Sequence, residues 1–254
     1  MRVVAAFLLY LVGVGAQVWA AEALVAVAAN FLAPVQRIAE VFTTQTGHSI
    51  QVVAGSTGKL YAQIRHGAPF EVLLAADAAT PRRLAQEGYA IDVSQFTYAV
   101  GELVLWSRDA DVVDADGQVL WAGDADHLAV ANPNVSPYGA AAFEALSNLN
   151  VLPRWRDHVV QGENIGQAYQ FVASGNAELG FVAASQVFDD GELRAGSVWV
   201  VPERLYQPIH QDAILLRRGQ DNPAATAFLS FLQGEQARAI VRSFGYGVPQ
   251  HAHQ

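Results

Sequence analysis

Polar residues with hydrogen-bond donors stand at the ends of several short apolar runs, directly before segments with helical spacing. They are Asn30 after the run 24–29, Ser56 and Thr57 after the run 50–54, and Tyr138 after the run 128–131. A strand that turns into a helix leaves unpaired backbone N–H groups at the helix start, where the helix dipole is positive. Such turns bind anions, so their recurrence predicts several helix starts that converge on one anionic ligand.

The donors at these turns are all neutral. We expect Asn30 to offer side-chain N–H groups, Ser56 to cap a helix, Thr57 to offer a hydroxyl and a first-turn amide, and Tyr138 to offer a phenol O–H. The pair Asn164-Ile165 opens a fourth helix, where the Ile165 amide is unpaired. Neutral donors suit a fully deprotonated dianion, whereas phosphate, partly protonated at pH 7, also requires an acceptor such as a carboxylate.

The turn 55–59 has three other possible interpretations. A nucleotide phosphate loop is excluded, because Val53 stands where its first glycine is needed and Leu60 replaces the magnesium-binding hydroxyl. The string 54–58 also resembles the nucleophile turn of a serine hydrolase, with Ser56 as nucleophile and His210 among the downstream partners. The third alternative is a structural turn without a ligand.

Composition limits the class of protein and its compartment. The 254 residues contain no cysteine and carry a net charge of −9, which argues against nucleic acid and anionic membranes as partners. Residues 1–20 have a positive start, an apolar core and a small-residue cleavage site, which predicts a removed secretory signal. Export without disulfides is typical of a bacterial periplasm.

Apolar runs alternate with helical spacing along the rest of the chain, which predicts an α/β fold of parallel strands and flanking helices. The long run 98–106 predicts a strand that crosses between two lobes. A second set of elements follows, then the strand 213–216, two helices that start near Asn222 and Glu235, and a loose tail from Gly245. Two sets joined by two crossings imply a ligand cleft between lobes. His251 and His253 belong to that tail and predict no metal site.

The chain resembles the periplasmic molybdate-binding proteins of ABC transporters over nearly its whole length after the signal. The resemblance rests on ordered strings, each weak alone: 25–31 (VAVAANF), 55–58 (GSTG) with 61–64 (YAQI), 67–69 (GAP), 96–101 (FTYAVG) with 103–106 (LVLW), 136–139 (SPYG), 179–182 (LGFV) and 245–246 (GY). Together and in this order they are specific. The chain departs from some relatives at Ala29, Asn30 and Ala183, where a hydroxyl or a tyrosine is common.

The resemblance implies a two-lobed solute-binding fold of type II, each lobe a mostly parallel sheet flanked by helices. It implies residues 21–100 with 206–254 as one lobe and 101–205 as the other. Molybdate or tungstate is then held between the lobes without direct metal ligands, by Ala29, Asn30, Ser56, Thr57, Tyr138 and Ile165. We expect a monomeric, non-enzymatic periplasmic receptor without a cofactor, which delivers the oxyanion to an ABC permease. Sulfate or phosphate remains the alternative ligand.

Overall fold

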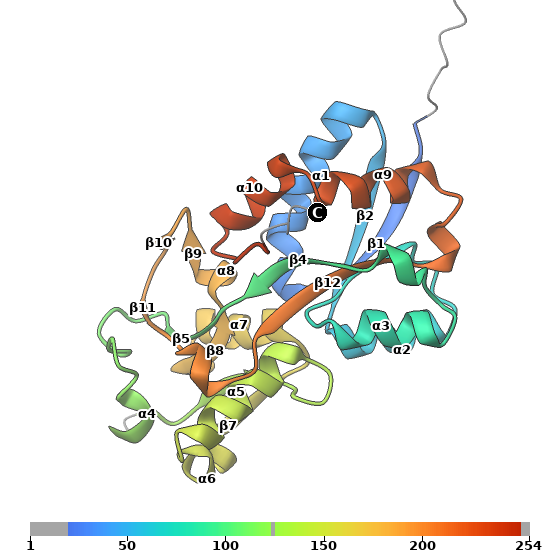
Figure 1. Ribbon diagram of the computed structural model, residues 1–254. Coiled ribbons are helices and arrows are strands. Elements are labelled where there is room, and N and C mark those ends of the chain that lie inside the picture. The colour runs from blue at the N-terminus through green and yellow to red at the C-terminus, as the bar shows by residue number, and fades with distance from the viewer. Residues whose placement is uncertain (1–19, 123–124, 250–254) are drawn as a thin grey trace, which may run out of the picture.

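The computed structural model describes residues 20–122 and 125–249, which form two sheets of five strands (Figure 1). The predicted signal 1–20 lies almost wholly outside the described residues, as do His251 and His253. Within the described part of the chain, no helix is long and apolar enough to cross a membrane.

The first sheet has the strand order β2-β1-β3-β12-β4. Its strands are β1 (Glu22–Ala28), β2 (Ser49–Gly55), β3 (Val72–Leu74), β4 (Phe96–Gly101) and β12 (Ile209–Leu215). The helices around it are η1 (Ala29–Phe31), α1 (Leu32–Thr46), α2 (Thr57–Arg65), α3 (Ala79–Gln86), η2 (Asp92–Ser94), η5 (Arg217–Gly219), α9 (Pro223–Leu232) and α10 (Glu235–Ser243).

The second sheet has the order β11-β5-β8-β6-β7. Its strands are β5 (Leu103–Ser107), β6 (Leu128–Ala131), β7 (Val159–Gly162), β8 (Leu179–Ala183) and β11 (Ser197–Val200). The helices around it are α4 (Val119–Ala122), α5 (Pro137–Asn148), α6 (Leu152–Trp155), η3 (Arg156–His158), α7 (Ile165–Ala173), α8 (Ala184–Val187) and η4 (Glu203–Leu205), and β9 (Phe188–Asp189) pairs with β10 (Glu192–Leu193) as a small separate ribbon.

The chain passes between the sheets twice. The run predicted as one long crossing strand is two strands, β4 and β5, that belong to different sheets and are separated by Glu102. The return path leads from β11 to β12, and β12 lies antiparallel beside β4 (Figure 1). In each sheet the pairs that involve these crossing strands are antiparallel, and the remaining pairs are parallel.

The first sheet is buried on both faces, as expected where helices cover both sides. In β1, Val25 and Val27 belong to a core with α1, α9 and α10, whereas Ala26 belongs to a second core with α2 and α3. This alternation follows the two-residue period of a strand. The second sheet has one large core that includes α5, α7 and α8.

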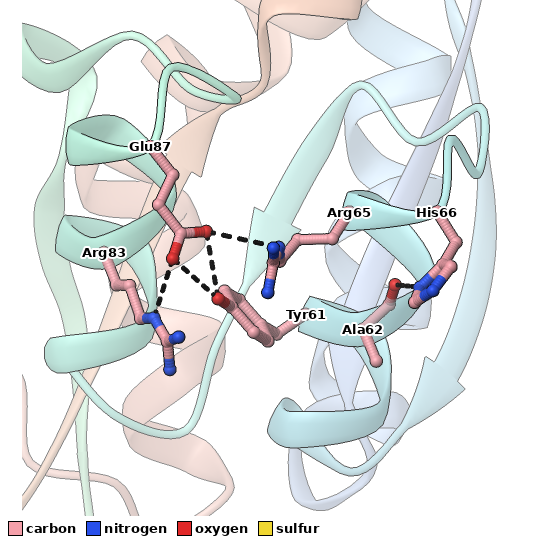
Figure 2. Close-up of polar contacts among 6 residues, drawn as sticks. All are labelled: Tyr61, Ala62, Arg65, His66, Arg83 and Glu87. Atoms are coloured by element: carbon pink, nitrogen blue, oxygen red, sulfur yellow. Dashed lines mark hydrogen bonds and ion pairs between the residues drawn. The ribbon is translucent and has the colours of Figure 1, made fainter.

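A surface cluster joins α2 to α3 beneath the first sheet (Figure 2). The Tyr61 hydroxyl donates to the Glu87 carboxylate at 2.9 Å, and Arg83 Nε donates to the same carboxylate at 2.9 Å. The guanidinium groups of Arg65 and Arg83 lie 5.7 and 4.7 Å from the centre of the Tyr61 ring. These exposed contacts each contribute little free energy, but together they fix how α2 lies against α3.

The end of the chain differs from the expectation of a loose tail. The Val100 amide donates to the Gly247 carbonyl at 2.7 Å, and Tyr246 is only 5% exposed. The prediction of a loose tail was wrong for residues 245–249, because the aromatic ring of Tyr246 packs against the ring of Phe31. The C-terminal segment therefore contributes to the interior between the crossing strands and η1.

Candidate functional site

Four helix starts meet where the two sheets face each other. In the first sheet, β1 and β2 end in register at Ala28 and Gly55; η1 begins at the next residue, and α2 begins after Ser56. In the second sheet, β6 and β7 end in register at Ala131 and Gly162, and they lead to α5 and α7. The carboxyl ends of parallel strands share one sheet edge, so each lobe presents two helix starts to the other.

The lobes are in contact at this place. The Gly58 amide in α2 donates to the Val135 carbonyl, just before α5, at 2.9 Å. The Ser185 hydroxyl in α8 donates to the Asn30 carbonyl in η1 at 3.1 Å. At the rim, Lys59 forms an ion pair with Glu163. A hollow of about 290 Å³ adjoins this contact and is lined by residues of both lobes, among them Asn30 and Ser185.

The residues that precede these helices differ in what their side chains do. Asn164 accepts a hydrogen bond from the Gln167 amide at 3.0 Å and Ser136 accepts one from the Gly139 amide at 3.4 Å, so both cap their helices. Ser56 holds the same position before α2 but makes no capping bond. The expectation that Ser56 caps α2 is therefore wrong.

Ser56 Oγ is the sole fully buried side-chain nitrogen or oxygen without a hydrogen-bond partner among the described residues, and Ser56 is only 3% exposed. Leaving a buried hydroxyl unpaired costs about 1–3 kcal/mol. A cap could have removed that cost, as it does at Ser136. The orphaned hydroxyl lies at the start of α2, where the helix dipole favours an anion.

Thr57 is buried beside Ser56. Its Oγ1 accepts a hydrogen bond from the Ala76 amide at 3.0 Å, which ties the start of α2 to the segment after β3. A hydroxyl that accepts one bond still has its own proton to donate. The neighbouring Gly58 amide already donates to Val135 across the cleft, and the Thr57 amide precedes it at the first helical position.

The Asn30 side chain is occupied within the protein. Its Nδ2 donates to Gln211 Oε1 at 2.8 Å and to the Tyr246 hydroxyl at 2.9 Å. These two bonds use both side-chain N–H groups, so the expectation that these groups point to a ligand is wrong. The backbone amides of Ala29 and Asn30 still stand in the first turn of η1, where a helix leaves N–H groups without an acceptor.

Tyr138 is the second residue of α5, and it is 1% exposed. Its hydroxyl oxygen accepts a hydrogen bond from Gln211 Nε2 at 3.2 Å. Burial raises the pKa of the Tyr138 hydroxyl well above its ordinary value. The phenol is therefore protonated throughout the physiological range and has one O–H to donate.

Ile165 begins α7 and is 2% exposed, and its carbonyl accepts from Gln186 Nε2 at 3.3 Å. Because Asn164 caps the Gln167 amide, the Ile165 amide at the first helical position is left to other acceptors. Ala29 faces α7 directly: a side-chain carbon built on Gly166 would lie 3.7 Å from the Ala29 side chain. Ile165 and Ala29 thus lie on opposite walls of one narrow gap.

No carboxylate is a side-chain hydrogen-bond partner of Asn30, Ser56, Thr57 or Tyr138 within the described chain. The nearby acids are engaged elsewhere, since Asp212 accepts from Thr97 Oγ1 at 2.7 Å and Asp77 accepts from the Thr80 amide at 2.6 Å. Residues 20–122 and 125–249 contain no cluster of three or more histidine, aspartate or glutamate side chains arranged to hold a metal ion. The donor set is neutral and suits an anion.

Sequence reasoning missed four side chains that complete this region. Gln211, Tyr98, Tyr246 and Ser185 are buried and hydrogen-bonded to each other or to the predicted residues. The Tyr246 hydroxyl donates to the Asn30 carbonyl at 2.8 Å, and burial raises the pKa of Tyr246 to about 12. The available signal was the polar run His210-Gln211-Asp212 inside an otherwise apolar strand.

Comparison with known proteins places this arrangement among binding proteins. Residues 23–247 match the model of a family described as bacterial extracellular solute-binding proteins. The chain is 52% identical to the molybdate-binding protein ModA of Azotobacter vinelandii over 229 residues, 90% of this chain and 91% of the relative. It is 47% identical to ModA of Rhodobacter capsulatus over 246 residues, 97% of this chain and 96% of the relative.

The solved structures agree in fold. The structure of the Azotobacter vinelandii periplasmic molybdate-binding protein superimposes with a TM-score of 0.87 at 38% sequence identity, and the match covers 90% of this chain and all of that one. Both crossings and the four helix starts lie within residues 23–247, the part of the chain that matches the family model.

Proposed function

The chain belongs to the bacterial extracellular solute-binding proteins, and we propose that it is the receptor that captures molybdate and delivers it to an ABC permease. The relatives at 52% and 47% identity are named as molybdate-binding proteins, not as enzymes. The single observation in the site that carries the proposal is Ser56 Oγ, which is buried and unpartnered at a helix start between the lobes.

We propose that six residues supply the donors to the oxyanion. In the first lobe these are the backbone amides of Ala29 and Asn30, the Ser56 hydroxyl and the Thr57 amide or hydroxyl. In the second lobe they are the Tyr138 phenol and the Ile165 amide. Every one is a neutral donor, so the charge of the dianion is balanced by hydrogen bonds and helix dipoles alone. Molybdate is the ligand, not a cofactor, and no residue binds molybdenum directly.

Selectivity over sulfate would come from size, because the two dianions have the same charge and shape. Donors fixed at the wider spacing of molybdate oxygens leave sulfate under-coordinated, and each unmade bond to a charged group costs about 1.5–3 kcal/mol. Tungstate, nearly the same size as molybdate, should bind about equally. Phosphate is disfavoured because its proton finds no carboxylate acceptor among the contacts that Ser56, Thr57 and Tyr138 make.

The proposal also covers the compartment, the oligomeric state and the bounds of the lobes. We propose a periplasmic monomer, exported by the signal 1–20, whose lobes comprise residues 21–100 with 206–254 and residues 101–205. The hydrolase alternative finds no support, because Ser56 Oγ makes no hydrogen bond to a histidine or other base among the described residues. A serine nucleophile requires such a base.

Isothermal titration calorimetry of residues 21–254 with molybdate, tungstate, sulfate and phosphate tests the proposal. We expect one-to-one binding of molybdate and tungstate and no heat from sulfate. If only sulfate or phosphate gave heat, the fold assignment would stand, but the ligand would be that anion and not molybdate. The absence of binding heat with all four anions would contradict the proposed function as an oxyanion receptor.

A further inference from the structure

Gln211 is a fully buried carboxamide in β12, one of the strands next to the crossing between lobes. The pairing of β12 with β4 shifts register between Gln211 and Asp212, which leaves Tyr98 of β4 without a partner while Gln211 stays paired with Ala99. Buried polar groups must find hydrogen-bond partners. Gln211 has three, and each of them belongs to a different element of the fold.

The partners determine which way the carboxamide faces. Gln211 Oε1 accepts from Asn30 Nδ2 at 2.8 Å and from the Tyr98 hydroxyl at 3.1 Å. The single proton of Tyr98 is shared with the Ala75 carbonyl, also 3.1 Å away, so the Asn30 amide is the donor that identifies this atom as the oxygen. The other end of the carboxamide is therefore Nε2. That nitrogen points to Tyr138 and donates to its hydroxyl oxygen at 3.2 Å.

This bond decides what Tyr138 can offer. A phenol oxygen that accepts from Gln211 directs its own proton elsewhere. The pair is also tightly enclosed: a side-chain carbon on Gly101 in β4 would lie 2.1 Å from the Tyr138 hydroxyl oxygen and 2.6 Å from Gln211 Nε2. The Tyr138 hydroxyl is thus held against the backbone of the crossing strand, with little freedom to turn.

We propose that Gln211 is a positioning residue that makes Tyr138 present its O–H, and not its lone pairs, to the bound oxyanion. This inference rests on the proposed function, in which Tyr138 is a donor to molybdate. Gln211 lies in the sheet of the first lobe and Tyr138 in a helix of the second, so their bond crosses the cleft. Asn30 donates to the oxygen of the same carboxamide. Closure of the lobes therefore determines whether Tyr138 presents a donor or an acceptor to the ligand.

Because Gln211 determines where the Tyr138 hydroxyl proton points, we infer that it contributes to the preference for molybdate over hydrogen phosphate. With the amide in place, every proposed group is a donor, which suits a fully deprotonated dianion. A carboxylate at position 211 would accept the proton of Tyr138 instead, so that the phenol lone pairs face the ligand. Those lone pairs repel molybdate but accept a bond from the proton of hydrogen phosphate.

The test measures molybdate and phosphate affinities of the exported chain and three variants by calorimetry at one pH. For Gln211→Glu we expect molybdate affinity to fall at least a hundredfold while phosphate affinity stays equal or rises. For Gln211→Met, which removes both polar ends without adding charge, we expect a three- to tenfold loss for molybdate. Tyr206→Phe removes a buried tyrosine hydroxyl that bonds the Leu103 amide and not Gln211, and we expect its molybdate affinity within threefold of the unmodified chain.

The ratio of the two affinities separates positioning from a merely structural role, which would weaken both anions alike. An unchanged molybdate-to-phosphate ratio in Gln211→Glu would overturn the inference. Should that variant not fold, molybdate affinity equal to that of the unmodified chain in Gln211→Met would overturn it as well. Failure of the unmodified chain to bind molybdate would instead reject the proposed function itself.

Discussion

Ser56 and Ser136 hold equivalent positions before α2 and α5 in opposite lobes, but only Ser136 caps its helix. Ser136 Oγ accepts from the Gly139 amide at 3.4 Å, whereas Ser56 Oγ has no partner. The same residue type at the same helical position therefore has two roles. One serine stabilises the fold, and we propose that the other is reserved for the ligand.

Ser56→Ala should separate these roles. Removal of an unsatisfied buried hydroxyl should leave the melting temperature of the ligand-free protein unchanged or higher. Molybdate affinity should fall roughly tenfold to a hundredfold, the loss for one hydrogen bond to a charged ligand. The matched control is Ser136→Ala, which loses a cap worth about 1 kcal/mol and should melt earlier. Equal melting losses in both variants would contradict the assignment of Ser56.

Tyr138→Phe tests the donor from the second lobe. The change removes the phenol O–H and should weaken molybdate binding by roughly one to two orders of magnitude in calorimetry. Tyr206→Phe is the control, because the Tyr206 hydroxyl accepts from the Leu103 amide at 3.2 Å, outside the proposed donor set. That variant should keep full affinity. Full affinity in Tyr138→Phe would remove Tyr138 from the site.

Gly58→Ala should block closure of the lobes without harming α2. A side-chain carbon at position 58 would lie 2.9 Å from the Val135 Cα atom of the other lobe, closer than such contacts allow. Alanine is also the better helix former, by about 1 kcal/mol, so the ligand-free protein should melt no earlier. We expect weaker molybdate binding and no compaction in small-angle scattering upon its addition. Compaction equal to that of the unmodified chain would show that this contact does not limit closure.

Binding should be insensitive to pH between about 6 and 9. Burial raises the pKa of Tyr138 well above its ordinary value and that of Tyr246 to about 12, so both phenols keep their protons across this range. Titrations at four pH values should give one affinity. A loss of affinity between pH 8 and 9 would mean that one of the donors ionises there.

Asp77 should make stability depend on pH in the acid range. Burial is the main reason that the Asp77 pKa is raised in the folded protein, so the folded state holds the proton more tightly than the unfolded chain does. This contribution to stability is present at low pH and is lost as the pH rises through the folded-state pKa. Asp77→Asn should therefore raise the melting temperature at pH 7, and the difference should close as the pH falls.

Local signals explain which parts of the fold could be read from the chain. Gly47 has φ of 75° and ends α1, a position that favours glycine, and Asn164 caps α7, which begins at Ile165 as expected. Each of these depends on neighbours within a few positions. The division of the long apolar run into β4 and β5 depends on pairing with β12 and β8, which no local pattern encodes.

The polar network behind the site was not readable for the same reason. Asn30 carries a local signal as a polar residue after a strand, and this correctly drew attention to η1. Its side-chain partners, Gln211 and Tyr246, are 181 and 216 positions away, and neither follows a strand end that marks a helix start. A donor that looks available along the chain can thus be occupied in the folded protein.

The bond between Asn30 and Tyr246 has a consequence for the newly made chain. During synthesis Asn30 emerges from the ribosome early and Tyr246 among the last residues, so a partly made chain lacks the hydroxyl that holds the Asn30 side chain and accepts from its Nδ2. Until that end is in place, Asn30 lacks two of its hydrogen bonds, one at the side-chain amide and one at the backbone carbonyl. Truncation before Tyr246 therefore removes contacts from the proposed ligand loop at Asn30, near the opposite end of the chain.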